Sequence, residues 1–391
     1  MPRDLLLSAE GRQGVEQSVA RLKGRITHRF ADDLLIARFP DSAKLQRLEA
    51  DFSAEAEASA PKTKSRAAAR ARPGGKISTL VAKAWAANLE SGPGLASTAE
   101  EGLSWTDQNF TAPAFNTGAF EADLLTPPLA GDVVFRAAGA PGGGVLRSTG
   151  TPTSRYMVGS IALGLVIVSG DSPSLRFTDA EKVKVIEQVQ KGANFLATAE
   201  PRAQVSFSYD VQDLVVTIGQ GPYPGAVDIY EQYEMGWRDE ALGKLGYSPG
   251  RVGYRAYANA LAADQGTRWA YVAFFTKYQL RHFAYAVSEK LVMNYANDNW
   301  GPDNIHRVFA HESCHIFGAS DEYGSCVCGE VSGELNGPNN NCVNCPRAQV
   351  PCLMNANTLQ FCKWTKKQIG WDASLFPPSP SAALTGKKRG E

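Results

Sequence analysis

Strand and helix patterns alternate through the middle of the chain. YMVGSIALGLVIVSG (156–170) is a long β-branched apolar run that is typical of a buried strand. FTDAEKVKVIEQVQKGANFLATAEP follows it and predicts a helix, because Thr178 and Glu181 have capping-box spacing and Pro201 ends the pattern. RAQVSFSYD then alternates like a second strand. This part of the chain therefore predicts a strand, a capped helix and another strand.

Helices and strands continue in mixed order toward the C-terminal half. Helical patterns cover residues 228–246 and 251–266, and RWAYVAFFTKY and HFAYAVSEKLVMNYA follow as two β-type segments. NIHRVFAHESCHIFG (304–318) then has the apolar spacing of a helix that ends at Gly318. This order predicts an α+β fold with a mixed sheet rather than a regular array of parallel βαβ units.

Composition and pattern divide the chain into five segments. Near the start, GRITHRF and DDLLIARF have β-type character, and DSAKLQRLEADF has helical spacing after Asp41, a favourable N-cap residue. The next residues are rich in alanine, serine, proline and basic side chains, and they cannot bury enough apolar surface to become ordered. The expected segments are a small α+β module (1–52), a flexible basic linker (53–76), a poorly patterned stretch of loops and short elements around the main domain (77–150), the main domain with its cysteine-rich C-terminal part (151–376) and a disordered tail (377–391).

Length and charge limit the classes of function. The chain has 391 residues, of which 43% are hydrophobic, so it has room for one large domain or two smaller ones. Its 40 basic and 40 acidic residues cancel, so no overall field attracts nucleic acid or an anionic membrane, and we expect neither as a partner. No stretch approaches the roughly 20 apolar residues of a membrane span, and the first residues do not resemble a secretory signal peptide.

All seven cysteines lie in one part of the chain, from residue 314 onward. Cys314 is expected as a small buried residue on a helix. In an exported protein the other six predict three disulfides, whereas in a reducing cytosol Cys326, Cys328, Cys342 and Cys345 would suit a second, structural zinc ion. The spacing CxC is a poor match to the usual zinc knuckle and favours disulfides, and with them export by a route that needs no classical signal.

The helix predicted at 304–318 contains residues that could bind a metal ion and act as a base. His311 and His315 are one turn apart, so both imidazoles project from the same face and can reach one metal ion. Glu312 is placed beside them, where it can hold and deprotonate a water molecule. Two ligands, a base and an open coordination position predict a catalytic metal site.

A third ligand is expected just after the helix. Gly318 permits a sharp turn, and Asp321 follows three residues later, which completes the pattern HExxHxxGxxD. Glu322 is the alternative, but consecutive side chains of an extended segment point in opposite directions. We therefore expect Asp321 to face the metal and Glu322 to face away, where it orients a ligand or pairs with a basic residue.

These motifs carry a family resemblance. HExxHxxGxxD, with PCLMNANTLQFC downstream, resembles the metzincin clan of zinc metallopeptidases in the variant with an aspartate ligand, as in snapalysin-like enzymes, and DEY (321–323) is similar to the IgA-peptidase-like members. The resemblance covers about 150–375 and implies a metzincin-like catalytic domain with a mixed sheet, an active-site helix and a C-terminal subdomain that contains a Met-turn. It implies these roles: zinc ligands His311, His315 and Asp321, general base and proton shuttle Glu312, and Met-turn residue Met354.

The implied reaction is zinc-dependent hydrolysis of a peptide bond by an endopeptidase. Zinc would acidify a water molecule, Glu312 would accept its proton and pass it to the leaving amine, and the substrate would be a peptide or protein. Some clan members have a tyrosine two residues after the methionine, where this chain has Ala356. Tyr323 could replace it, although we expect Tyr323 to have a packing role.

Two other functions fit the same residues. Two histidines and a carboxylate also form the ligand set of non-haem iron oxygenases, but such a site has no use for Glu312 as a neighbouring base. A binding or structural protein could retain the metal only for folding. The histidines outside the motif, His282 and His306, are expected at the surface or in the core.

The N-terminal module suggests regulation. RITHRFADDLLIARFPDSAKLQRLEA weakly resembles the small α+β propeptides of subtilase-type proteases, and the basic segment after it would be easily cut. This predicts a zymogen with a removable prodomain; a permanent accessory domain is the alternative. No cysteine precedes the catalytic helix, so latency through a thiolate on zinc is excluded.

Overall fold

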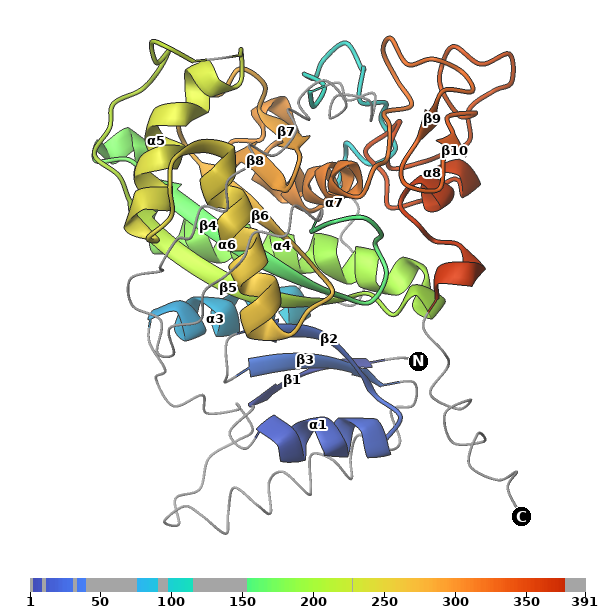
Figure 1. Ribbon diagram of the computed structural model, residues 1–391, viewed down its shortest axis with the longest axis horizontal. Coiled ribbons are helices and arrows are strands. Elements are labelled where there is room, and N and C mark those ends of the chain that lie inside the picture. Colours follow the sequence, from blue (N-terminus) through green and yellow to red (C-terminus); the bar gives the residue numbers. More distant parts are fainter. Residues whose placement is uncertain are drawn as a thin grey trace, which may run out of the picture.

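A mixed β-sheet flanked by helices organises the described part of the chain (Figure 1). The computed structural model describes residues 3–8, 12–30, 34–39, 76–90, 98–114, 153–226 and 228–376. The strands are β1 (Arg3–Ser8), β2 (Arg25–Phe30), β3 (Leu34–Phe39), β4 (Ser160–Ser169), β5 (Ser206–Val215), β6 (Trp269–Thr276), β7 (Ala284–Val287), β8 (Lys290–Asn294), β9 (Val331–Ser332) and β10 (Gly337–Pro338). The helices are α1 (Arg12–Arg21), α3 (Lys76–Glu90), α4 (Asp179–Ala199), α5 (Glu231–Lys244), α6 (Gly250–Gln265), α7 (Ile305–Ile316) and α8 (Lys363–Gln368).

Eight strands form the large sheet, in the order β1-β3-β2-β5-β4-β6-β8-β7. Five consecutive strands of this order are parallel to one another: β2, β5, β4, β6 and β8. Strands β3 and β7, which lie on either side of these five, run in the opposite direction. The antiparallel β7 is an edge strand. The α+β class with a mixed sheet, predicted from the sequence, is therefore confirmed.

The two faces of this sheet are covered by different helices. Successive residues of a strand point to opposite faces. Ile161 and Leu163 of β4 belong to the core shared with α3, α4 and α7, whereas Ala162 and Val166 belong to the core shared with α5 and α6. Burial on both sides explains the continuous apolar run of β4, and it places the HExxH helix α7 on one face.

The capped helix predicted from the sequence is present as α4. Its N-cap residue Thr178 donates its backbone N–H to a Glu181 carboxylate oxygen at 2.7 Å, and the Thr178 hydroxyl accepts the Glu181 N–H at 3.3 Å. This reciprocal capping box satisfies two backbone donors that the first turn would otherwise leave free. Helix α4 then packs against α7, so it supports the helix with the histidines.

The N-terminal strands extend the main sheet instead of forming a separate one. Strand β2 pairs with β5 in parallel, with His28 opposite Phe207. The Arg25 guanidinium donates to the carbonyls of Val205 and Ala197 at 3.0 and 2.6 Å. Helix α1 covers the outer face of β1–β3 (Figure 1). The strands predicted in this module are present, and the helix predicted after Asp41 lies outside the described residues.

The structure differs from the sequence expectation at the start of the segment 77–150. Loops and short elements were expected there, and Lys76 was counted in the linker, but Lys76–Glu90 form helix α3. Leu80 and Ala84, four residues apart, are buried in the core that contains α4. The pattern is short and rich in alanine, so packing against the neighbouring helix contributes most of its stability. The expected tail 377–391 lies outside the described residues.

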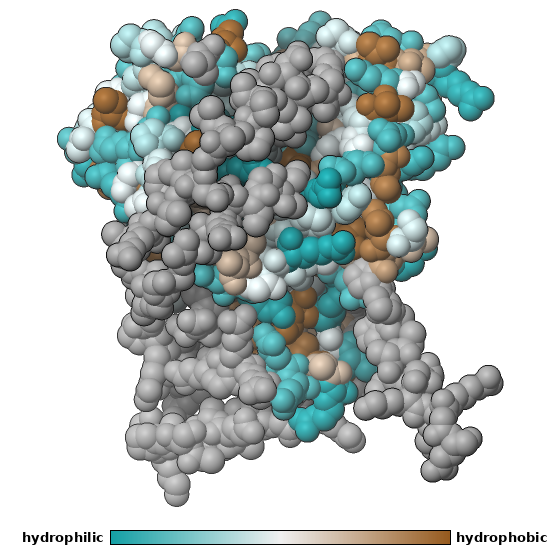
Figure 2. Space-filling model, viewed as in Figure 1, coloured by the Kyte–Doolittle hydropathy of each residue, from teal (hydrophilic) through white to brown (hydrophobic). Residues whose placement is uncertain are grey.

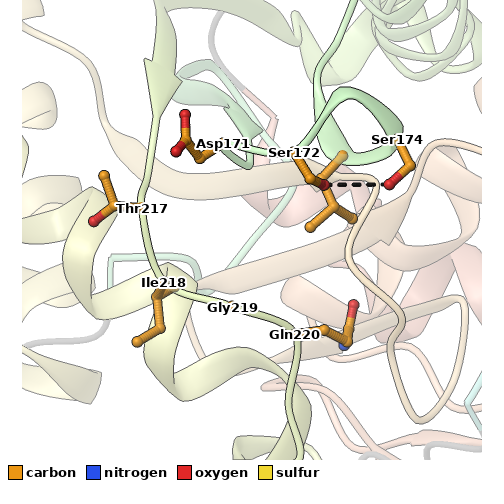
Figure 3. A pocket seen from close by; sticks show the side chains of 8 residues that line it. Asp171, Ser172, Ser174, Thr217, Ile218, Gly219 and Gln220 are labelled. Atoms are coloured by element: carbon orange, nitrogen blue, oxygen red, sulfur yellow. Dashed lines mark hydrogen bonds between the residues drawn. The ribbon is translucent and has the colours of Figure 1, made fainter.

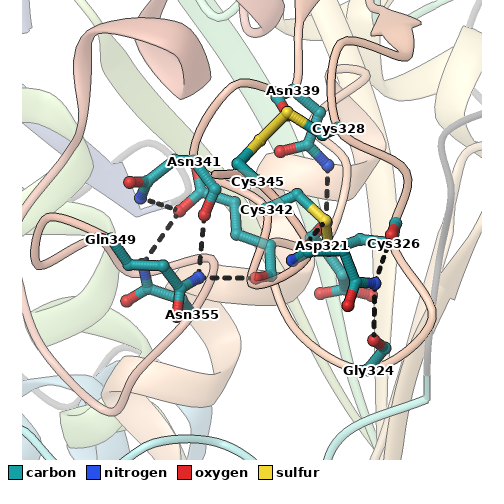
Figure 4. Close-up of a disulfide and its surroundings, with 12 residues drawn as sticks. Asp321, Gly324, Cys326, Cys328, Asn339, Asn341, Cys342, Cys345, Gln349 and Asn355 are labelled. Carbon is teal, nitrogen blue, oxygen red and sulfur yellow. Dashed lines mark hydrogen bonds between the residues drawn. A yellow bond between two sulfur atoms is a disulfide. The ribbon is translucent and has the colours of Figure 1, made fainter. Parts of the chain in front are cut away.

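Two disulfides cross-link the loops after α7. Cys326 pairs with Cys342 and Cys328 with Cys345 (Figure 4). The predicted disulfides are thus confirmed for these four cysteines, and this pairing leaves no thiolates there for a structural zinc ion. Cys314 is buried on α7, as expected. The remaining two cysteines are buried free thiols, so the third predicted disulfide is not formed in this structure.

The surface of the C-terminal subdomain contains exposed apolar side chains. Figure 2 shows hydrophobic residues over the part of the molecule that Figure 1 labels β9 and β10. Four valines of this subdomain are 45% to 58% exposed: Val327, Val331, Val343 and Val350.

Within the described residues, the structure contains no helix with the length and apolar character needed to span a membrane.

A cluster of charged side chains is buried between α5 and the sheet. Glu234 is completely buried, and its carboxylate contacts the Arg238 guanidinium and the Lys290 ammonium. The Tyr285 hydroxyl donates to the same carboxylate at 2.6 Å. Burial alone would raise the pKa of Glu234, but the charges of Lys290 and Arg238 lower it to about 2. The pair interactions therefore outweigh the cost of burial for this carboxylate.

We expect Glu234→Ala to destabilise the fold strongly. The substitution leaves the buried cations Arg238 and Lys290 without this partner, which typically costs about 3–5 kcal/mol. Urea unfolding would measure it. Lys244→Ala is the matched control, because Lys244 forms an exposed pair on the same helix and should change stability by less than about 1 kcal/mol. Equal stability of the two variants would contradict the role given to Glu234.

Candidate metal centre

Helix α7 carries the two histidines of the motif into the protein interior. Its N-terminal half packs through Val308 and Phe309 against the core that contains α4. The Ser313 hydroxyl is 2.9 Å from the Tyr271 hydroxyl of β6, which fixes the rotation of the helix against the sheet. His311 and His315 are four positions apart, so they leave the helix on one face, and both are buried.

A glycine turn brings the chain back to this face, as predicted. Gly318 has φ +91°, and a Cβ there would lie 2.7 Å from the Gly333 Cα, so glycine is required for both its conformation and its size. The Ala319 N–H donates to the Cys314 carbonyl at 3.0 Å and closes the helix end. Asp321 then reaches the histidines. Asn339, from the disulfide-linked loops, holds the Asp321 carbonyl at 2.8 Å (Figure 4).

Three side-chain atoms converge on one point. The Nε2 atoms of His311 and His315 are 3.1 Å apart, and the Asp321 Oδ1 atom is 3.1 Å from the first and 3.3 Å from the second. Ligand atoms about 2.1 Å from a tetrahedral zinc ion are about 3.4 Å apart. The donor types and their separations therefore fit zinc, and these three residues would hold it.

The hydrogen bonds of the other ring nitrogens set the tautomers. His311 Nδ1 is 2.9 Å from the Leu353 carbonyl, and His315 Nδ1 is 2.8 Å from the Ala319 carbonyl. Because a carbonyl only accepts, each Nδ1 carries a hydrogen. In a neutral ring Nε2 then has a lone pair and no hydrogen. The two Nε2 lone pairs and the Asp321 carboxylate face one another and repel, unless a cation or a proton lies between them.

Glu312 is a buried carboxylate beside this point. Its side chain is fully buried, and neither of its oxygens has a hydrogen-bond partner among the described residues. Burial raises the pKa of Glu312 to about 8. A buried carboxyl without partners is costly to keep, and such groups are found where chemistry requires them.

The metal-free ligands share protons. Burial lowers the pKa of His311. For His315 the Asp321 carboxylate outweighs burial and raises the pKa to about 9. The same interaction lowers the pKa of Asp321 to about 2, although burial acts in the opposite direction. The pKa values of Asp321 and His315 in the unfolded chain are about 4 and about 6.5. Between these pH values the His315–Asp321 ion pair contributes its full stability. It is lost as pH rises through 9 or falls through 2.

We expect zinc affinity to rise with pH well above the usual histidine range. A metal must displace the proton that His315 retains up to about pH 9, so affinity should increase about tenfold per pH unit between roughly pH 7 and 8.5. Competition with a chelator calibrated at each pH would measure it. A histidine with an ordinary pKa would give a flat response in this range, and that result would contradict the assignment.

Glu322 faces away from the metal ligands, as predicted. Its carboxylate accepts hydrogen bonds from Asn341 at 2.5 Å, Asn355 at 3.1 Å and Thr365 at 2.9 Å. These partners are neutral rather than basic. The Glu322 N–H donates to the Met354 carbonyl at 3.0 Å, which joins the segment after α7 to the predicted Met-turn.

Met354 and Tyr323, which the sequence also indicated, are buried near the site. The Tyr323 ring centroid lies 6.1 Å from that of His311, and its hydroxyl donates to the Pro113 carbonyl at 3.2 Å. Burial and the Asp321 charge raise the pKa of Tyr323. The phenol therefore stays protonated, and its buried ring packs beside His311.

Sequence reasoning missed Trp105. Its ring centroid is 5.2 Å from that of His311 in an edge-on arrangement, and its indole N–H donates to the Leu353 carbonyl at 2.7 Å. His311 binds the same carbonyl, so Trp105 helps to position a ligand. A lone tryptophan in a segment rich in polar residues and turns gave no signal for this role. Of the other three histidines, His306 and His28 are buried and bonded to Gln188 and to Tyr209. His282 is half-buried, with its ring centroid 5.9 Å from that of Tyr230.

A hollow elsewhere on the surface offers less chemistry. It has a volume of about 490 Å³ and lies where β4 and β5 end, between Ser172 and Gln220 (Figure 3). Asp171 is the carboxylate in its lining, and it pairs with the exposed Arg176 at 3.1 Å. Its other lining side chains are hydroxyl, amide and aliphatic groups, with neither histidine nor cysteine. The histidine cluster is therefore the stronger candidate site.

Comparisons with known proteins add no family assignment. No protein-family model matches the chain, and a search of curated proteins gives no significant match. The function must therefore be argued from the motif and from the geometry of the metal centre.

Proposed function

We propose that this protein is a zinc-dependent endopeptidase that hydrolyses peptide bonds in peptide or protein substrates. One observation carries the proposal: Glu312, a buried carboxylate without hydrogen-bond partners among the described residues, directly follows His311, and its charge interacts with His315 and Asp321 of the convergent group. A purely structural metal site has no need for such a group.

The finer assignment is a metzincin-like catalytic domain with zinc on His311, His315 and Asp321. The return of the chain at Gly318 supports it, since the aspartate of HExxHxxGxxD lies against both histidines. The turn that contains Met354 supports it as well, because the carbonyl before this methionine orients His311. Met354 is buried and is proposed as the methionine of a Met-turn.

The side chains would divide the reaction between them. Zinc supplies Lewis acidity, which acidifies water and polarises the substrate carbonyl. Glu312 accepts the proton from the attacking water and later donates it to the nitrogen of the leaving amine. Without a metal ion, burial raises the pKa of Glu312 to about 8; a bound cation would lower it and favour the carboxylate form that accepts the proton.

Metal analysis and a cleavage assay on the full chain test this proposal. We expect one equivalent of zinc and cleavage of internal bonds in a mixed peptide library, read by mass spectrometry. Cleavage should stop after chelation and return with added zinc. Iron in place of zinc would overturn the proposal in favour of the oxygenase. Stoichiometric zinc without cleavage of any library member or unfolded protein would favour a binding or structural protein.

A further inference from the structure

Two free thiols lie together behind the metal centre. The Cys362 N–H donates to Cys352 Sγ at 3.4 Å, and the two sulfurs contact the same Thr365 hydroxyl at 3.2 and 3.3 Å. With the nearest oxygen of Glu322, the two sulfurs lie within 4.8 Å of one another. Both cysteines are buried, and ten positions separate them in sequence.

We propose that Cys352 and Cys362 form a third disulfide, which ties the turn containing Met354 to the start of α8. Cys362 is the N-cap residue of α8, and Cys352 begins the predicted Met-turn. Two other disulfides lie in the same subdomain, and the oxidising conditions that form them would also oxidise this pair. The two sulfurs lie within 4.8 Å of each other, and closing the bond brings them to about 2 Å.

The surroundings favour a disulfide over a second metal ion. Each oxygen of Glu322 already accepts two hydrogen bonds: Thr365 and Cys362 donate to Oε1, and Asn341 and Asn355 donate to Oε2. The carboxylate is therefore satisfied without a cation. Among the described residues, the cluster offers only three ligand groups, one fewer than a structural zinc site uses.

The exchange reaction needs an external disulfide of low molecular weight. The thiolate of Cys362 attacks one of its sulfurs, expels one thiol and forms a mixed disulfide. The thiolate of Cys352 then attacks Cys362 Sγ and expels the second thiol. Two protons and two electrons leave the protein and are taken up by the external disulfide. Cys362 is the better nucleophile, because the hydrogen bond from Cys352 lowers its pKa to about 6 and it retains 4% exposure.

This cross-link would fix two backbone carbonyls that position residues of the proposed metal centre. Leu353, the residue after Cys352, provides the carbonyl that orients His311 at 2.9 Å. The next carbonyl, of Met354, accepts the N–H of Glu322. Loss of such outer contacts typically lowers metal affinity about 10–100-fold. The effect on metal binding rests on the proposed function, whereas the disulfide itself does not.

Peptide mapping of the full chain tests the disulfide. The protein is equilibrated in glutathione buffers of graded potential, alkylated in denaturant and digested without reduction. We expect a species that contains Cys352 and Cys362 and is lighter than its reduced form by two hydrogens, while Cys314 is alkylated throughout. After trypsin both cysteines lie in one peptide, because no lysine or arginine separates them. Full alkylation of both cysteines in the most oxidising buffer would overturn the proposal. So would a second bound zinc or cadmium ion in the reduced protein that C352S and C362S both lose.

A matched comparison tests the link to the metal centre. In the same oxidising buffer, the double variant C352S/C362S retains the other two disulfides, and C314S controls for loss of a buried thiol. We expect the double variant to release zinc to a chelator about tenfold faster than the wild type and C314S. Where the double variant does not fold, the wild type replaces it, in a buffer whose potential reduces the Cys352–Cys362 disulfide and leaves the other two intact. Equal release rates would remove the link but leave the mapped disulfide intact.

Discussion

Glu312→Gln should abolish peptide hydrolysis while the protein remains folded and loaded with zinc. Glutamine has the size of glutamate but cannot accept a proton, so a drop of at least about 100-fold in kcat is expected from loss of the general base. The side chain is fully buried without hydrogen-bond partners among the described residues, so an uncharged amide should not lower the free energy of unfolding by much. Steady-state cleavage of one peptide substrate measures the effect.

The controls separate loss of chemistry from loss of metal. Zinc content by elemental analysis and the melting temperature of the Gln variant should stay close to those of the wild type. A variant that hydrolyses the peptide within a few-fold of the wild-type rate would refute the role of Glu312 as the base. A variant that lost its zinc would instead place Glu312 among the ligands.

Asp321→Ala should remove zinc and activity together. The Asp321 carboxylate contacts both histidines, at 3.1 and 3.3 Å, and its loss leaves only two ligands from the protein. Loss of a group that only hydrogen-bonds to a ligand lowers metal affinity by up to roughly 100-fold, and loss of the ligand itself should lower zinc affinity by more than that. Chelator competition would measure the affinity, and Asp321→Asn, which conserves size, would show that the effect is not caused by a cavity.

Glu322 provides the matched comparison, because it is the next residue and also a buried carboxylate. Glu322→Ala should keep zinc and lose less activity, but it should unfold more easily, since it leaves Asn341, Asn355 and Thr365 without their acceptor. Each unsatisfied buried group costs about 1–3 kcal/mol. Loss of zinc in the Glu322 variant alone would show that the ligand assignment after Gly318 is off by one residue.

The sequence carried the strongest information where one local rule decides the structure. The capping box of Thr178 and Glu181 defined the start of α4, and the glycine at 318 defined the end of α7. The HExxH spacing placed two histidines on one helix face, and the opposite directions of Asp321 and Glu322 followed from the alternation of an extended chain. These features depend on residues close together in sequence.

Features that depend on distant residues were missed. Helix α3 has a weak pattern of its own and is supported by α4, about a hundred residues later. The contact of Trp105 with His311 joins segments some two hundred residues apart, and nothing local indicates it. Nor could the cysteine spacing show which pairs would join: adjacent thiols at 352 and 362 become visible only when the Met354 turn lies against α8.

Because β2 pairs in parallel with β5, cutting the chain after the N-terminal module would not by itself release that module. A protease that cuts between residues 53 and 75 breaks the covalent chain, but β2 remains hydrogen-bonded to β5 and holds β3 and β1 beside it. They are also held by the Arg25 contacts and by the stacked rings of Phe30 and Tyr209, whose centroids are 4.3 Å apart. The cut protein would behave as a two-piece complex in the manner of fragment complementation, and dissociation of its small piece would expose an unpaired, aggregation-prone sheet edge.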